Sequence, residues 1–421
     1  MGVEMTVEAI NRTIREASEK TVHKSQSEIG AVIGSTVEWP LSATIHKGLE
    51  GAIACESKIG YVDGVNGHLV YRGYDCFELS EFSNFEETSY LLIYGKLPQE
   101  KELKEFKEKL VSYREVPEKV FDMIKRTNVK TTHPMIDLYM GVGILASLNE
   151  KTEDKSVENQ TEIAIKLIAQ MAALVGGIAR LRKGLDPLKP KPDLTHAANL
   201  IYMMTGEEPD EVSAKVMDIS LILHADHGMN ASTFTAMVAN SSLSDMYSSI
   251  VAGITSLKGS LHGGANEKVL YDLEEIGVPE KAEEWFKKAR EAKRKVMGFG
   301  HRVYKAYDPR ARIFGPLVKY MVEKNPEVSA LYATARKLDE IICEELGKEK
   351  KIFPNVDFYS GLIYRAMKIE TEMFTPLFAA SRISGWSARI LEYLNENRIF
   401  RPRAVYTGPL HLDYESMEKR K

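Results

Sequence analysis

The chain has 421 residues, of which 44% are hydrophobic and 28% charged, and its formal net charge is -4 at pH 7. This length can bury a large core and predicts two or three domains, and the composition excludes a mostly disordered chain. The slightly acidic balance excludes a general nucleic-acid binder, although a local basic pocket for a small anion stays compatible with it.

Three scattered cysteines are too few for a disulfide framework or a thiolate zinc site, and they fit a reducing cytoplasm. The amino-terminal residues carry two acidic side chains and no apolar run, so we expect neither a secretory signal nor a transit peptide. The most apolar segment, 167–179, ends at Arg180 and is too short to cross a bilayer. We therefore expect a soluble cytoplasmic protein that has no membrane partner.

The amino-terminal quarter contains the only predicted strands. Apolar residues at helical spacing predict a short helix from Thr6 to about Ala17. Residues 25–47 contain breakers and read as an irregular arm. The segment 52–74 alternates apolar and polar residues around Asp63-Gly64 and Asn66-Gly67, which predicts one β-hairpin.

The rest of the chain has helical periodicity. It predicts helices over 85–94, 100–114, 120–125, 134–148, 162–182, 194–205, 209–223, 250–257, 265–276, 283–297, 312–347, 362–367 and 375–395. Residues 354–357 are predicted to form a loop. The match of 141–146 to a dinucleotide-binding pattern is rejected because it lies inside a helical run. We expect an all-α fold with a short β-hairpin near its amino terminus.

Three of the ten histidines lie within forty residues, at His224, His227 and His262. His224 and His227 are three residues apart, so on one helix they would share a face and, with Asp226, imitate a two-histidine, one-carboxylate metal site. That pattern leaves open a metal-dependent hydrolase. The alternative is that His224 packs at a helix end while His227 alone points into a cleft.

His262 lies in Leu-His-Gly-Gly, just before a predicted helix. The positive end of that helix disfavours an imidazolium ion, and a neutral imidazole can donate a hydrogen bond to a carbonyl oxygen as it becomes an enolate. Its alternative role is to fill a glycine turn. The two glycines that follow permit close approach of a ligand to the backbone, which favours function.

Two further segments carry candidate polar groups. Gly298-Phe299-Gly300-His301 exposes backbone that could enclose a flat or phosphorylated ligand, although the pattern alone is common. Asp357 lies among apolar neighbours, so burial would raise its pKa and make it a better base. A helix N-cap is the other reading of Asp357.

Arg310, Arg382 and Arg401 are candidate carboxylate-binding residues, because a guanidinium group matches a carboxylate bidentately. The neighbours of Arg382 read as a buried helix, and a buried arginine requires an anionic partner. From the residues alone we infer an enzyme that handles a small carboxylate by proton transfer, without identifying its reaction.

Together these motifs resemble the citrate synthase family. The most specific is GFGHRVYKAYDPR at 298–310, and it is supported by HADHGMNAST, LHGGANE, FPNVDFYSG, the early ESKI and YRGY, and the closing RPRAVYTGP. The resemblance covers about 48–409. It implies condensation of an acyl-CoA, usually acetyl-CoA, with oxaloacetate, followed by thioester hydrolysis, and it implies no metal or other cofactor.

The resemblance also implies a mostly helical homodimer in which each subunit has a large domain and a smaller closing domain. By position, residues 1–47 are an amino-terminal helix and arm. The large domain comprises 48–263 and 368–421, and the small domain comprises 264–367. Domain closure would exclude water from the reacting thioester. No amino-terminal β-domain of the large, NADH-regulated bacterial members is recognisable.

Residue roles follow from the resemblance by matching position. Asp357 is expected to remove a proton from the acyl methyl group, His262 to hydrogen-bond the thioester oxygen, and His301 to assist at the oxaloacetate carbonyl. The oxaloacetate carboxylates are expected to bind His227, Arg310, Arg382 and an Arg401 that comes from the neighbouring subunit. The expected CoA-binding residues are Val296, Met297, Gly298, Phe299, Gly300 and Lys305.

One departure from the family pattern is Ser260, which stands where many members have proline. It is expected to loosen the turn before His262 and to leave the chemistry in place. The nearest rival activity is that of 2-methylcitrate synthase, which uses propionyl-CoA. One methylene group changes binding by only about 1 to 3 kcal/mol, so the sequence leaves this choice open.

Overall fold

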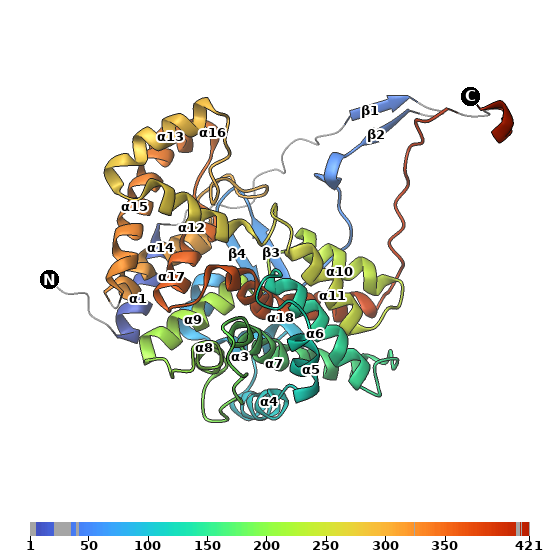
Figure 1. The fold of residues 1–421 in the computed structure, drawn as a ribbon, viewed down its shortest axis with the longest axis horizontal. Helices are drawn as coiled ribbons and strands as arrows, with labels where there is room; N and C mark the ends of the chain where they lie inside the picture. Colours follow the sequence, from blue (N-terminus) through green and yellow to red (C-terminus); the bar gives the residue numbers. More distant parts are fainter. Residues whose placement is uncertain are drawn as a thin grey trace. The chain divides into compact units, whose positions relative to one another are not determined.

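The computed structural model describes residues 6–20, 35–38, 42–323, 325–409, 413 and 415–420 (Figure 1). The chain divides into two compact units. The first comprises Met1–Lys24 and Ser57–Arg398, and the second comprises Ser25–Glu56 and Ile399–Lys421. All of the candidate site residues except Arg401 belong to the first unit.

The first unit begins with helix α1 (Val7–Glu19), which confirms the predicted amino-terminal helix. The Thr6 side chain caps it by accepting a hydrogen bond from the Ala9 N–H. Its buried face contacts helix α14 (Pro309–Val322), where the hydroxyls of Thr13 and Tyr320 lie 2.7 Å apart. The amphipathic pattern of α1 therefore reflects packing within the chain.

The predicted hairpin is present, with shorter strands than expected. Strands β3 (Gly60–Asp63) and β4 (His68–Tyr71) pair antiparallel, and β5 (Tyr74–Asp75) adds to β4, so the sheet order is β3-β4-β5. The Asp63 carboxylate accepts backbone hydrogen bonds from Val65 and Asn66 and so closes the turn.

Helices make up most of the first unit, as predicted. Those before the LHGG segment are α2 (Cys76–Phe82), α3 (Phe85–Tyr94), α4 (Glu100–Tyr113), α5 (Glu118–Lys125), α6 (Pro134–Leu148), α7 (Val157–Arg182), α8 (His196–Thr205), α9 (Glu211–His224), α10 (Ala231–Ser241) and α11 (Met246–Leu257). Those after it are α12 (Ala265–Ile276), α13 (Ala282–Glu291), α14, α15 (Pro326–Ile342), α16 (Lys348–Lys350), α17 (Val356–Ala366) and α18 (Phe374–Leu394).

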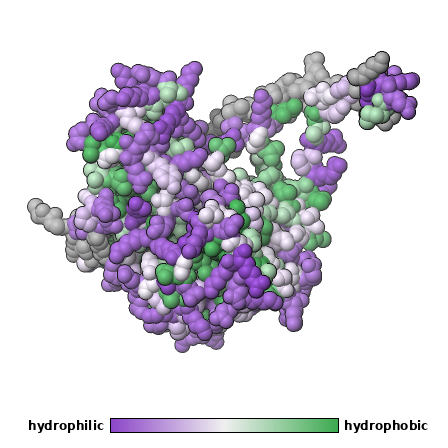
Figure 2. Space-filling model, viewed as in Figure 1, coloured by the Kyte–Doolittle hydropathy of each residue, from purple (hydrophilic) through white to green (hydrophobic). Residues whose placement is uncertain are grey.

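The centre of the core is formed by α7 and α18, which pack against each other (Figure 1). With 26 residues, α7 is long and apolar enough to cross a bilayer, so the prediction that the apolar segment was too short is wrong. Instead, 89% of its apolar window is buried inside the protein, as in the core helix of a soluble domain. Polar residues cover most of the face shown in Figure 2, and apolar patches are smaller.

A second group of helices covers the predicted small domain. Helix α17 packs against α12, α14 and α15, and a π-helical turn at Cys343–Gly347 follows α15. Several boundaries differ from the prediction, and the largest differences are at the end of α13 and the start of α17. Helix α13 ends at Glu291 because Lys293 has a positive φ of 53°, and α17 begins at Val356, inside the predicted loop 354–357.

The second unit contains a short antiparallel pair, β1 (Ser35–Glu38) and β2 (Ser42–Ile45), with Ser35 opposite Ile45. A 3-10 turn at Lys47–Leu49 follows β2. The prediction of an irregular arm over 25–47 is therefore wrong for these strands. Residues 25–34 and 39–41 lie outside the described part of the chain.

Candidate active site

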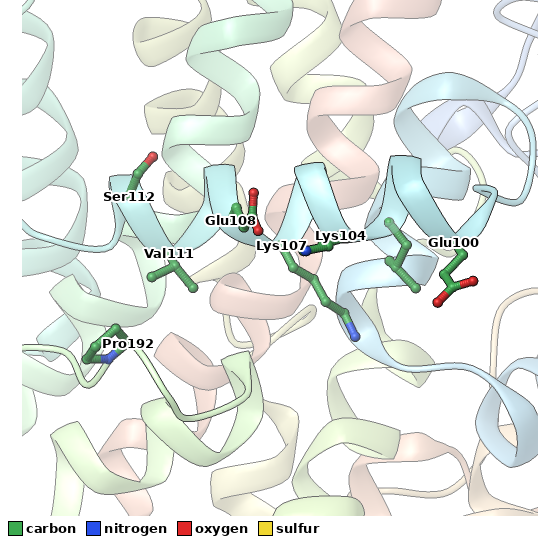
Figure 3. Close-up of a pocket in the computed structure, with 8 residues that line it drawn as sticks. Glu100, Lys104, Lys107, Glu108, Val111, Ser112 and Pro192 are labelled. Atoms are coloured by element: carbon green, nitrogen blue, oxygen red, sulfur yellow. The ribbon is translucent and has the colours of Figure 1, made fainter.

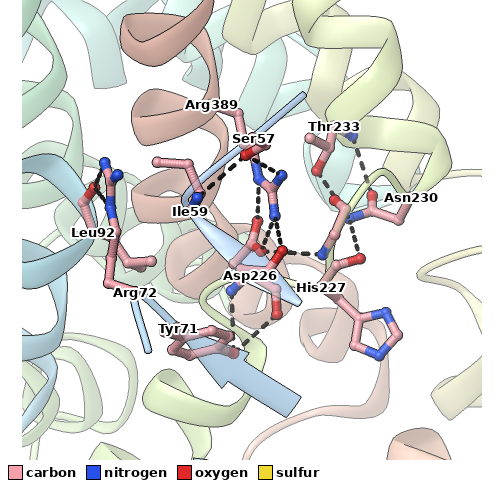
Figure 4. Close-up of polar contacts among 12 residues, drawn as sticks. Ser57, Ile59, Tyr71, Arg72, Leu92, Asp226, His227, Asn230, Thr233 and Arg389 are labelled. Atoms are coloured by element: carbon pink, nitrogen blue, oxygen red, sulfur yellow. Dashed lines mark hydrogen bonds and ion pairs between the residues drawn. The ribbon is translucent and has the colours of Figure 1, made fainter. Parts of the chain in front are cut away.

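The turn after α9 positions the first histidine. The Tyr71 hydroxyl donates to the carbonyl oxygen of Asp226 at 2.9 Å and lies 3.1 Å from that of Ile222, so it caps the end of the helix (Figure 4). The Asp226 carboxylate accepts two hydrogen bonds from Arg389 on α18, at 3.2 and 2.7 Å. These contacts fix the backbone that carries His227, whose ring points away from the ion pair in Figure 4.

This turn does not support the metal-site alternative. Helix α9 ends at His224, so His224 and His227 do not share a helical face, and His224 packs at the helix end as the alternative reading expected. His224 Nδ1 bonds the Ser220 carbonyl at 2.8 Å, and Asp226 is committed to Arg389. Among the residues that the structure describes, no group of three or more histidine, cysteine, aspartate or glutamate side chains could hold a metal ion.

His262 lies between α11 and α12, directly before α12 as predicted. The Ser232 N–H donates to His262 Nε2 at 3.3 Å, and the Ser232 hydroxyl lies 2.8 Å from the same nitrogen. Burial lowers the pKa of His262 to about 3, with a further contribution from the positive charge of Arg382. The ring is therefore neutral at pH 7, and its proton lies on Nδ1, which is free to donate.

His301 has the opposite tautomer. Its Nδ1 accepts hydrogen bonds from the backbone N–H groups of Val303 at 3.0 Å and Tyr304 at 3.2 Å. Burial lowers the pKa of His301 to about 4, although the nearby Asp308 carboxylate opposes this. The neutral ring therefore carries its proton on Nε2. Two neutral histidines thus present hydrogen-bond donors from different nitrogens.

His227 joins these rings into one cluster. Its ring centre lies 5.1 Å from that of His301, and its Nε2 lies 3.2 Å from the Tyr304 hydroxyl. Burial lowers the pKa of His227 well below its usual range, and the charges of Arg310 and Arg382 lower it further. The cluster therefore contains neutral imidazoles next to permanent positive charges.

Both buried arginines belong to this cluster. Arg310 on α14 is 2% exposed and forms two hydrogen bonds with Asp308, at 3.0 and 2.7 Å. Arg382 on α18 is 1% exposed and donates through Nε to the His224 carbonyl at 2.6 Å. Its buried Nη1 finds no hydrogen-bond partner among the described residues. A buried cationic donor without an acceptor fits an anionic ligand.

Asp357 lies in the first turn of α17, not in a loop. Asn355 is the N-cap and accepts a hydrogen bond from the Asp357 N–H at 3.0 Å, so Asp357 is not the capping residue. Burial raises the pKa of Asp357 to about 7, although the charges of Arg310 and Arg382 oppose this. Its buried Oδ1 has no hydrogen-bond partner in the described part of the chain. This carboxyl group can exchange a proton near neutral pH.

Backbone contacts join the base to the glycine turn before His301. Gly300 N–H donates to the Phe353 carbonyl at 2.9 Å, and Asn355 N–H donates to the Gly298 carbonyl at 2.8 Å. Gly298 has a φ of 77°, and a Cβ atom there would come within 2.9 Å of the Phe358 ring. Only glycine fits this position, so the two segments pack closely.

The expected CoA-binding residues have different environments. The ring of Phe299 is buried against Phe358, with ring centres 4.6 Å apart, so it is not free to stack on a ligand. Val296 and Met297 pack against the core, while Lys305 is exposed and its N–H donates to the Gly64 carbonyl at 2.7 Å. Their binding of CoA stays a prediction.

Arg401 is exposed and belongs to the second unit, so it is not among the residues that the first unit brings together. A pocket of about 570 Å³ is lined by none of the candidate histidines (Figure 3). Its lining comes from α4 and Pro192. Sequence reasoning missed the roles of Ser232 and Tyr304, although both lie inside the quoted motifs.

The fold and the cluster define a helical acid–base enzyme with buried arginines suited to a small carboxylate substrate. The chain matches the family described as "Citrate synthase, C-terminal domain" over residues 48–403. It is 44% identical to a citrate synthase of Deinococcus radiodurans, over 90% of this chain and 100% of that protein. It is also 36% identical to a citrate/2-methylcitrate synthase of Bacillus subtilis, over 86% and 96%.

Two solved structures have the same fold, which confirms the predicted fold class. Citrate synthase from Pyrobaculum aerophilum gives a TM-score of 0.85 at 41% identity, over 94% of this chain and 100% of that one. The Thermoplasma acidophilum enzyme, a ternary complex with carboxymethyl coenzyme A and oxaloacetate, gives 0.85 at 35% identity, over 89% and 99%. This chain belongs to the citrate synthase family.

Proposed function

We propose that this protein condenses acetyl-CoA with oxaloacetate and hydrolyses the resulting thioester to citrate and CoA, the entry reaction of the tricarboxylic acid cycle. Family membership supports this reaction. The observation that carries it is that a buried carboxyl group, Asp357, with a pKa raised to about 7, and a neutral donor, His262, both interact with the charge of Arg382. A base and a hydrogen-bond donor are what enolisation of a thioester requires.

Oxaloacetate is expected to bind at the cationic side of the cluster. The free Nη1 of Arg382 can donate to one of its carboxylates, and Arg310 and His227 can hold the other. Burial lowers the pKa of Arg382 only to about 10, so its charge is retained at neutral pH. The Asp308 carboxylate keeps Arg310 in a fixed orientation.

Asp357 is expected to remove a proton from the methyl group of acetyl-CoA. As that C–H bond breaks, negative charge develops on the thioester oxygen, which accepts a hydrogen bond from His262 Nδ1–H. The enol carbon then attacks the oxaloacetate carbonyl carbon, and His301 Nε2–H donates to the carbonyl oxygen as it becomes a hydroxyl group. Water hydrolyses the thioester and releases CoA. The scheme uses no cofactor or metal ion.

CoA is expected to contact the segment that leads into the glycine turn. Backbone groups of Val296, Met297, Gly298, Phe299 and Gly300 are proposed to line its adenine pocket. Because the Phe299 ring is buried, we assign this contact to its backbone. The exposed Lys305 is proposed to face a CoA phosphate.

Domain closure is proposed between a large domain of 48–263 with 368–421 and a small domain of 264–367. Gly263 and Gly264, between His262 and α12, would supply the flexible joint. His301 and Asp357 lie in the proposed small domain, whereas His227 lies in the large one. Closure would therefore assemble the site and exclude water from the enolised thioester.

The working enzyme is proposed to be a cytoplasmic homodimer. Helix α6 is almost entirely apolar, yet Tyr139, Met140 and Ile144 are only half-buried and Gly143 is exposed. An apolar helix face open to solvent is typical of an interface. Arg401 would reach oxaloacetate from the partner subunit.

A shared site makes mixed dimers informative. Arg382→Ala and Arg401→Ala are each expected to lower activity severely, because each removes a carboxylate donor. When the two inactive proteins are unfolded and refolded together, about half of the dimers should be mixed, and each should contain one intact site. We expect recovery of about a quarter of the wild-type activity, measured as CoA release. If native mass spectrometry showed mixed dimers but CoA release did not recover, Arg401 would not contribute to the active site of the partner subunit.

Acetyl-CoA is expected to have a higher kcat/KM than propionyl-CoA. The two substrates differ by one methylene group, so the expected ratio is about 10 to 200. Oxaloacetate-dependent CoA release should be measured for both substrates with the same enzyme. A higher kcat/KM for propionyl-CoA would assign the protein as a 2-methylcitrate synthase instead.

A further inference from the structure

Asp339 forms a polar cluster outside the residues that would touch substrate. It lies on α15 and is 7% exposed. Its Oδ2 accepts hydrogen bonds from the hydroxyls of Tyr307 at 3.0 Å and Tyr359 at 2.5 Å. Its Oδ1 accepts a hydrogen bond from the Cys343 thiol at 3.1 Å. Because all three donors bind one buried carboxylate, their side chains are held in fixed positions relative to one another.

The two tyrosines belong to the two segments that carry the proposed chemistry. Tyr307 lies within 301–310, and Tyr359 lies on α17, two residues after Asp357. Burial raises the pKa of both phenols well above their usual range, and the Asp339 charge raises both further. Both hydroxyls therefore remain protonated donors, and one carboxylate connects the two segments.

Packing limits any other position for the tyrosine rings. A Cβ atom on Gly315 of α14 would lie only 3.2 Å from the Tyr359 ring, so this ring fits closely against the helix. The Tyr307 ring lies 6.1 Å from that of Phe353 and under the guanidinium group of Arg312. The hydroxyls cannot easily turn to new acceptors, so their direction depends on Asp339.

We propose that Asp339 is a positioning residue for proton abstraction, which holds α17 and the segment 301–310 at the separation that the reaction needs. The inference rests on the proposed function and deepens it. Asp357 Oδ1 has no hydrogen-bond partner among the described residues, so the position of the base depends on the backbone of α17. Tyr359 anchors that backbone one half-turn further along the helix.

The rate should depend on this anchor more than substrate binding does. Proton transfer requires close contact of the reacting atoms, and a displacement of about 1 Å can cost ~100-fold in rate. Oxaloacetate binding should change less after such a shift, because Arg382 lies on α18, outside both segments, and the paired side chains of Arg310 and Asp308 would move together as one unit. A loss in kcat with little change in KM for oxaloacetate therefore distinguishes positioning from a general loss of the site.

The test compares Asp339→Asn, Tyr307→Phe and Tyr359→Phe with a matched control, Tyr332→Phe. Tyr332 lies on the same helix as Asp339, and its hydroxyl donates a hydrogen bond to the Gly315 carbonyl at 3.1 Å. Among the described hydrogen bonds, it forms none with Asp339, Tyr307 or Tyr359. We expect Asp339→Asn to lower kcat about 10- to 100-fold per folded molecule, with KM for oxaloacetate within about 3-fold. The control should keep wild-type kcat.

A double variant tests whether the effects share one cause. Asp339→Asn combined with Tyr359→Phe should lose little more than the worse single variant, because both act on the same hydrogen bond: asparagine weakens it by removing the negative charge, and phenylalanine removes its donor. A wild-type kcat in Asp339→Asn, with only a lower melting temperature, would overturn the proposal. If that variant does not fold, wild-type kcat in both tyrosine variants would overturn it instead. An inactive wild-type protein would refute the proposed function first, and this inference with it.

Discussion

Asp357→Asn is expected to lower kcat by about 10² to 10⁴, the usual contribution of a positioned general base. Asparagine has nearly the same shape as aspartate but cannot accept the methyl proton. The wild-type kcat/KM should also fall as the pH is lowered through about 7, because the raised pKa leaves Asp357 protonated, and inactive as a base, below that value. CoA release measured from pH 5.5 to 9 tests both expectations.

A second buried carboxyl group provides the matched control. Burial and the Glu86 charge raise the pKa of Asp218 to about 7, and its Oδ1 accepts a hydrogen bond from the Phe85 N–H. Asp218→Asn keeps that acceptor and should keep the acid limb of the pH profile. The assignment of the base to Asp357 would be wrong if Asp357→Asn kept normal turnover and the loss of activity at low pH. It would be wrong in favour of Asp218 if Asp218→Asn removed that loss.

His262→Ala is expected to lower kcat by about 10² to 10³, the usual cost of removing one donor to a developing oxyanion. KM for oxaloacetate should change little, since the donor acts on the thioester. His196→Ala is a suitable control, because burial lowers the pKa of His196 to about 3 as well, and it lies at the start of α8. If both variants lost kcat equally, the effect of His262→Ala would be explained by lost packing and not by a lost hydrogen-bond donor.

Helix boundaries could be predicted where the chain marks both ends. Helices α3, α6 and α12 have the predicted bounds because a capping residue, a proline or a glycine stands at their ends. The strands β1 and β2 were missed because each has only four residues and the breakers Gly34 and Pro40 lie beside them in the sequence. Asp357 was placed in a loop because Pro354 and Asn355 precede it as typical loop residues, whereas the helix begins directly after its N-cap Asn355.

The chemistry of the site was only partly readable. The family motifs identified the histidines, the aspartate and the arginines, but not which nitrogen of His262 or His301 carries the proton. That depends on the backbone N–H groups of Ser232, Val303 and Tyr304, whose directions are set by folding. Residue spacing likewise left open whether His224 and His227 share a helical face, and the end of α9 at His224 decides against it.

Arg382 also shows a conflict between two demands on one position. The folded chain buries a charged guanidinium group whose Nη1 is unmatched by any described acceptor, at a site surrounded by Phe378 and other apolar side chains. An apolar residue of similar volume would fit these surroundings at a lower desolvation cost. Selection for turnover therefore keeps α18 below its best attainable stability, and screens for thermostability alone would favour replacements here that abolish turnover.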